Sequence, residues 1–219
     1  MTPSEQISKL DEAFLKSISI DAGTVPDQTT RANLHAYLVL SHAVMEEHIE
    51  SLFESYFQRL LAHLDDEKIP RACLTLAYSV ADRASATDKL SYHKRSVRHE
   101  IERLGAPILA KAIKSNNGLK SNNVESLAQA AGVSWNDFDD ALSTHLANLQ
   151  SLGVRRGDAG HLSPFSGKLT AIEEVIHPSH VREWVDNGLN ALAAIEQFLD
   201  GTLQTATPAS ETPSVSSVV

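Results

Sequence analysis

The feature that most constrains the fold is a long apolar stripe between residues 29 and 63. Apolar side chains recur there every three or four residues, and neither glycine nor proline interrupts the run. This period predicts one continuous amphipathic helix, about 50 Å long at a rise of 1.5 Å per residue. Such a helix is a scaffold or a dimer spine. The stripe comprises Leu34, Tyr37, Leu38, Ser41, Val44, Met45, Ile49, Leu52, Phe53, Tyr56 and Leu60.

The remaining periodic stretches also predict helices, over residues 4–20, 70–84, 123–131, 134–152 and 179–199. We expect Gly105-Ala106-Pro107 to interrupt the chain, Asn123 to cap the start of a helix and Gly132 to follow its end. Ser134 with Asp137 resembles a capping box. No run of alternating strand residues is evident. The predicted fold class is all-α, with residues 1–203 as one helical domain.

Composition narrows the function classes. The 219-residue chain has a net charge of -9 and a pI near 5.5, which argues against a broad basic surface for long nucleic acids. Its one cysteine, Cys73, lies in an apolar run and predicts a buried structural thiol. Without a signal-like start or a run of roughly 18 apolar residues, we expect a cytoplasmic protein with no membrane contact. Residues 204–219, rich in Thr, Ser, Pro, Ala and Val, predict a disordered tail.

The strongest functional signal is the stretch VRRGDAGH, residues 154–161, in which four residues separate Arg156 from His161. A histidine exchanges a proton near neutral pH, and an arginine holds a phosphate by a two-pronged contact. These two groups suffice for RNA cleavage by the substrate's own 2′-hydroxyl, without metal or other cofactor. Positions five apart on a straight helix differ by about 140°. We therefore expect the helix to end or bend here, at Gly153, Gly157 and Gly160.

This motif, following one core helix, preceding a final helix and facing a long earlier one, resembles the signature of the HEPN family. The likeness is greatest to its toxin-like ribonuclease branch. It implies a helical bundle with a long second helix and the motif on the penultimate core helix. It also implies a metal-independent endoribonuclease acting in toxin–antitoxin or antiviral defence, with Arg156 and His161 catalytic. A homodimer with two facing motifs is implied as well, together with an antitoxin or defence-system partner protein.

Several alternatives stay open. Arg155 could be the motif arginine, since the family also uses a spacing of five residues; otherwise Arg155 and Asp158 are expected to contact the substrate. Gly157 and Gly160 depart from the residues that the family often carries there. The chain could then be a catalytically inactive HEPN binding or adaptor module, or a helical interaction protein with a chance motif. The other histidines form no pattern typical of a metal site, although His42 lies four residues before Glu46 and His177 three residues before His180.

Overall fold

The structure, a computed structural model, describes residues 1–20, 26–66, 69–83, 96–161 and 177–204, without the side chains of Gly160 and His161. These residues form helices and short connections, and no strand occurs among them. The all-α prediction is therefore confirmed. No helix in the described part of the chain is both long and apolar enough to cross a membrane. Residues 205–219, and with them the predicted tail, lie outside the described ranges.

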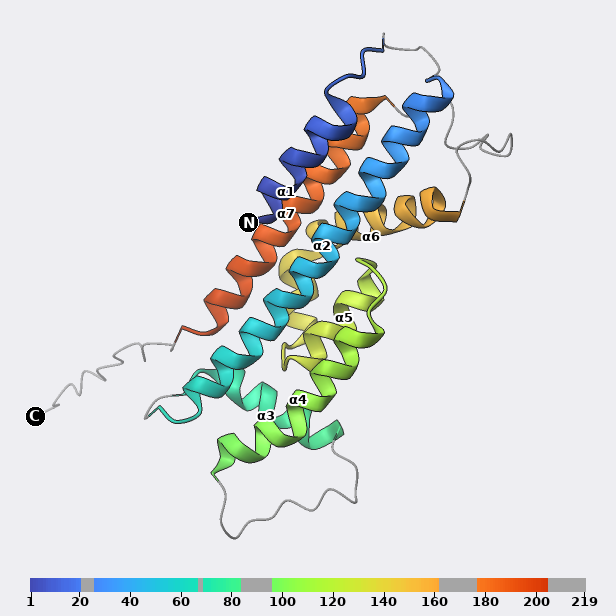
Figure 1. The fold of residues 1–219 in the computed structure, drawn as a ribbon. Coiled ribbons are helices and arrows are strands. Elements are labelled where there is room, and N and C mark those ends of the chain that lie inside the picture. The colour runs from blue at the N-terminus through green and yellow to red at the C-terminus, as the bar shows by residue number, and fades with distance from the viewer. Residues whose placement is uncertain (21–25, 67–68, 84–95, 162–176, 205–219) are drawn as a thin grey trace, which may run out of the picture.

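Helix α2 (Gln28–His63) is the centre of the molecule, as its apolar stripe predicted. Its N-terminal half lies beside α1 (Pro3–Leu10), and α6 (Trp135–His161) crosses it (Figure 1). Helix α7 (Pro178–Thr202) runs along α2 as far as the contacts of Thr202 with Tyr56 and of Asp200 with Arg59. The C-terminal half of α2 is covered by α3 (Arg71–Arg83), α4 (Val97–Ser115) and α5 (Ser121–Ala130) (Figure 1). Helix α2 thus connects α1 at one end of the molecule to α3, α4 and α5 at the other.

Aromatic packing and one close approach hold α6 and α7 on α2. Phe138 of α6 is fully buried, with ring centroids 6.1 Å from Phe53 and 5.3 Å from Phe198. Gly188 of α7 approaches α2 so closely that a Cβ there would lie 2.7 Å from the sulfur of Met45. A Cβ there would push aside the flexible end of the Met45 side chain, so glycine lets α7 and α2 pack without that rearrangement.

The first helix is shorter than the sequence predicted. Thr2 caps α1 in a capping box with Glu5, and the α-helix ends at Leu10. The next five residues, Asp11–Leu15, form a π-helical turn. In this turn Asp11 is largely buried and accepts an ion pair from Arg182 of α7 at 2.6 Å. The apolar spacing did not predict this π-helical turn, which coincides with an ion pair between residues far apart in the sequence.

The prediction that Gly105-Ala106-Pro107 interrupts the chain is wrong. All three lie inside α4, which runs unbroken from Val97 to Ser115. A Cβ at Gly105 would lie 3.0 Å from both the Phe57 ring and Val80, so the helix packs closest to its neighbours there. Burial of Ile101, Leu104 and Leu109 along the same helix offsets the hydrogen bond that proline removes.

The end of helix α5 agrees with the prediction, but its start does not. Asn123 does not cap α5, because the helix begins at Ser121 with Lys120 as its N-cap. Gly132 follows α5 with φ +86°, a conformation that side-chain-bearing residues rarely adopt. A Cβ there would also meet the Leu76 backbone at 2.7 Å. Gly132 is thus needed both for the turn and for contact with α3.

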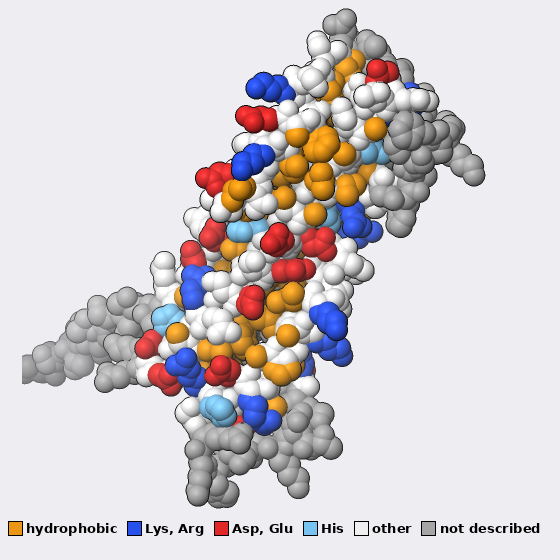
Figure 2. Space-filling model, in the orientation of Figure 1, with side chains coloured by type: hydrophobic (Ala, Val, Ile, Leu, Met, Phe, Trp, Pro, Cys, Tyr) orange, Lys and Arg blue, Asp and Glu red, His pale blue; other side chains and the backbone are white. Residues whose placement is uncertain are grey.

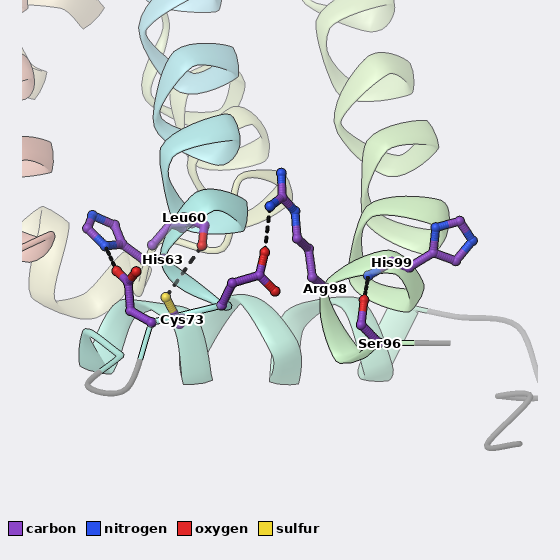
Figure 3. Close-up of polar contacts among 8 residues, drawn as sticks. Leu60, His63, Cys73, Ser96, Arg98 and His99 are labelled. Carbon is purple, nitrogen blue, oxygen red and sulfur yellow. Dashed lines mark hydrogen bonds and ion pairs between the residues drawn. The ribbon is translucent and has the colours of Figure 1, made fainter. Parts of the chain in front are cut away.

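Polar contacts close the end of the bundle where α2, α3 and α4 meet (Figure 3). Cys73 is buried and its thiol donates to the Leu60 carbonyl at 3.6 Å, as expected of a structural cysteine. Burial raises the pKa of this thiol. Arg98, in the first turn of α4, donates to Asp65 at 2.6 Å, and Ser96 caps α4 by accepting from the His99 amide. Arg98 is therefore tied to the end of α2.

Candidate functional site

The motif residues lie on the last turns of α6. This helix continues through Gly153 and Gly157 to His161, so of the two expected outcomes, an end or a bend, the glycines do not end it before the histidine. Two glycines are no obstacle inside a helix whose buried side is supplied by Leu146, Leu149 and Leu152. The His161 side chain lies outside the part of the chain that the structure describes, so its distance from Arg156 stays a prediction.

The two arginines contact different neighbours. The guanidinium carbon of Arg155 lies 3.7 Å above the ring centroid of Trp184 on α7, in a cation–π contact. Its Nε also donates to Ser151, one turn earlier, at 3.4 Å. The charge of Arg156 instead acts on His42 and Glu46 of α2. Arg155 therefore contacts α7, whereas the charge of Arg156 acts on groups of α2.

His42 is the least expected member of this site. It is 1% exposed, and neither ring nitrogen has a hydrogen-bond partner among the described residues. Burial, and next the positive charge of Arg156, lower its pKa to about 4, so the ring is neutral at pH 7. Its Nδ1 lies 3.4 Å from Glu46 Oε2, within ion-pair distance. Because a neutral ring carries no charge, we interpret this as a polar contact.

Glu46 has the opposite shift. Burial raises the pKa of its carboxyl group, the nearby Glu50 adds to the rise, and Arg156 acts to lower it. The half-buried carboxyl group of Glu46 thus lies close enough to Glu50 and Arg156 for both charges to change its pKa. Acidic side chains gather over the middle of α2 (Figure 2). The cluster of Arg156, His42 and Glu46 consequently combines an arginine with two groups that can exchange protons.

The turn between α4 and α5 holds this cluster in place. Asn116 donates to Glu50 of α2 at 2.6 Å, and the Ser121 amide donates to Gln150 of α6 at 2.8 Å. Gly118, at φ +151°, leaves room for the His42 ring, which a Cβ there would approach to 3.4 Å. The turn therefore connects both helices that carry the site.

Space remains beside the arginines. A Cβ at Gly157 would meet no described atom within 4 Å, whereas one at Gly153 would lie 3.0 Å from the Lys120 side chain. Asp158 is exposed, and no ion pair joins it to Arg155 or Arg156 among the described residues. Among the described residues, nothing therefore fills the space next to Gly157.

Sequence reasoning treated His42 and Glu46 only as a possible metal pair. Within the described ranges no group of three or more His, Cys, Asp or Glu side chains could hold a metal ion. The available signal was a histidine and a serine at core positions of the longest apolar stripe, where a buried polar group needs an explanation. His177, another candidate in that reading, caps α7 by accepting from the Ser179 amide.

Comparison with known proteins supports the resemblance seen in the sequence. A family model described as RiboL-PSP-HEPN matches residues 5–201. No curated protein and no solved structure gives a significant match. The match begins within α1, ends within α7 and includes the motif-bearing helix. The chain therefore belongs to the RiboL-PSP-HEPN family and is a HEPN domain.

Proposed function

We propose that this HEPN domain is a metal-independent endoribonuclease. HEPN domains are often nucleases, and family membership alone leaves the activity of this chain open. The observation that carries the proposal is Arg156, which makes no hydrogen bond or ion pair with the other described residues. An arginine held at a helix end beside open surface is available to bind a phosphate.

The proposed reaction needs only the nucleotide and this chain's side chains. The 2′-hydroxyl oxygen attacks the phosphorus as its proton is removed, and the bond to the 5′-oxygen breaks as that oxygen gains a proton. The products are a 2′,3′-cyclic phosphate, which hydrolyses to a 3′-phosphate, and a free 5′-hydroxyl. His161 exchanges protons and Arg156 stabilises the charge that grows on the phosphate oxygens.

Cleavage of mixed RNA by the purified chain is expected to persist in EDTA and to be lost in His161→Ala. Losing a proton-transfer group costs about 100- to 10,000-fold in rate. The measurement is gel analysis of the fragments, with their ends tested for cyclic phosphate or 3′-phosphate. The control is His180→Ala, because this histidine lies on α7 outside the motif.

A requirement for an added divalent ion, or products ending in 3′-hydroxyl, would contradict the mechanism. RNA binding without cleavage would favour the other candidate function, a HEPN binding or adaptor module. A biological role as a toxin or abortive-infection effector, with an antitoxin or defence-system partner protein in the cytoplasm, belongs to the same proposal. Growth arrest on expression that disappears in His161→Ala would support that role.

We also propose that two chains pair across the N-terminal half of α2. Between Arg31 and Glu46 this helix carries no acidic residue, lysine or arginine. One of its sides stays partly or fully exposed, and Leu40 is 41% exposed. Figure 2 shows hydrophobic side chains gathered at this end of the molecule. The exposed side, here called the α2 face, consists of Ala32, Ala36, Val39, Leu40 and Ala43.

The α2 face suits a composite site. Ala43 lies beside His42 and Glu46, so two-fold pairing there would bring both copies of Arg156 to one cleft. Two-fold symmetry is the commonest arrangement of oligomers. The second His161 would then supply the second proton-transfer group that the reaction uses. Paired arginines would also attract RNA to an otherwise acidic protein.

Leu40→Glu is expected to convert a dimer into monomers and to reduce cleavage, because a carboxylate in an apolar interface loses its hydration. Light scattering at micromolar concentration measures the first effect. Leu74→Glu is the matched control, since Leu74 is 53% exposed on α3, away from the α2 face. Recovery of activity on mixing His161→Ala with Arg156→Ala chains would support a composite site. A monomer with full activity would rule it out.

A further inference from the structure

The Arg155 guanidinium has two flat faces, and the contact with Trp184 occupies one of them. Trp184 is partly buried and packs on the hydrophobic core. The Arg155 guanidinium covers its ring at 3.7 Å, and Arg155 is itself only partly buried. Going outward from the core, the indole is followed by the partly exposed guanidinium. Within the described residues no carboxylate pairs with Arg155.

The contact between Arg155 and Trp184 lies next to Arg156, and this position indicates which ligand it would bind. Arg155 and Arg156 are adjacent on α6, and Arg155 contacts α7 whereas the charge of Arg156 acts on His42 of α2. No described atom lies close to the position that a Cβ would take at Gly157. A nucleotide strand with one phosphate at Arg156 would therefore bring a neighbouring base toward the planar guanidinium. Unpaired bases stack on aromatic rings and on arginine planes.

We infer that Arg155, backed by Trp184, forms a base-stacking subsite for a single-stranded nucleotide next to the phosphate held by Arg156. This inference rests on the proposed function and names its substrate class as unpaired RNA. Stacking needs only the flat face of a base, so the subsite orders the strand without selecting one base. Bases inside a duplex are covered on both faces, and paired RNA is therefore a poor ligand for it.

Tryptophan fluorescence provides a test that does not require cleavage. The chain has two tryptophans, so Trp135→Phe leaves Trp184 as the reporter. The probe is a single-stranded oligoribonucleotide with 2′-fluoro sugars, which lack the attacking hydroxyl. Matched oligonucleotides each carry one abasic position and keep every phosphate. Binding of the intact probe is expected to change Trp184 emission. Loss of the stacked base is expected to weaken binding about tenfold.

Arg155→Lys is the decisive variant, because lysine keeps the charge and lacks the planar face. It is expected to weaken binding of the intact oligonucleotide and to remove the difference between intact and abasic probes. Equal binding of both probes by the Trp135→Phe protein with Arg155 intact, or unchanged Trp184 emission, would overturn the inference. Cleavage without any abasic effect would overturn the subsite and leave the proposed function standing. An abasic effect without cleavage would overturn the proposed ribonuclease function and leave the stacking contact standing. Absence of both the abasic effect and cleavage would overturn both proposals.

Discussion

Arg156→Ala is expected to lower the kcat of RNA cleavage by about 100- to 1,000-fold, the usual cost of removing one donor that stabilises transition-state charge. Arg156 is the arginine of the pair without a hydrogen bond or ion pair among the described residues, whereas Arg155 is stacked on Trp184. Arg156→Lys should recover only part of this loss, because an ammonium cannot make the two-pronged phosphate contact. Single-turnover cleavage of a labelled RNA measures the effect.

Arg155→Ala is the matched comparison. Arg155 contacts Trp184 of α7. Because it is proposed to hold a base and not the reacting phosphate, its loss should raise KM more than it lowers kcat. Thermal melts of both variants show whether either change disturbs the fold. If Arg155→Ala proves the more damaging to kcat, the motif begins at Arg155 and the spacing of five residues applies.

Phe138→Ala is expected to destabilise the protein by about 3–5 kcal/mol, the usual cost of deleting a buried phenyl ring and leaving a cavity. This is a large share of the stability of a typical domain, which is about 5–15 kcal/mol. Phe138 is fully buried at the junction of α2, α6 and α7, in ring contact with Phe53, Trp135 and Phe198. Urea denaturation at one fixed protein concentration measures the change.

Phe138→Leu is the control, since it keeps most of the apolar volume and should cost about 1.5 kcal/mol or less. A loss below about 1 kcal/mol for the alanine variant would show that the three helices do not depend on this ring, given typical losses for buried aromatics. A changed urea m-value would point to altered compactness of the denatured state instead.

Helix positions followed closely from apolar spacing, because a buried side must repeat with the helical turn. Helix α2 spans the expected residues, and Phe138, Leu142 and Leu146 are buried on α6. Local signals failed where tertiary packing overrode them. Gly105 sits within a helix because Phe57 and Val80 lie against it, and no sequence window contains those neighbours.

The site was predictable only along one helix. Arg155, Arg156 and His161 form a local motif that the sequence displays directly. The contribution of α2 depends on how it crosses α6, more than 100 residues later in the chain. His42 is polar and fully buried, a combination that only three-dimensional neighbours explain. The charge of Arg156 reaches it across that crossing.

The unbroken course of α2 limits how chain length can vary. One residue inserted into a helix rotates everything beyond it by about 100° and shifts it by about 1.5 Å. In α2 such an insertion between His42 and Phe53 would rotate His42 relative to Phe53, Phe57 and Leu60, so the four side chains could not all keep their buried positions. Deletions would do the same in the opposite sense. Related chains should therefore gain or lose residues between helices and keep α2 at constant length, because this length fixes the distance between the two ends of the bundle.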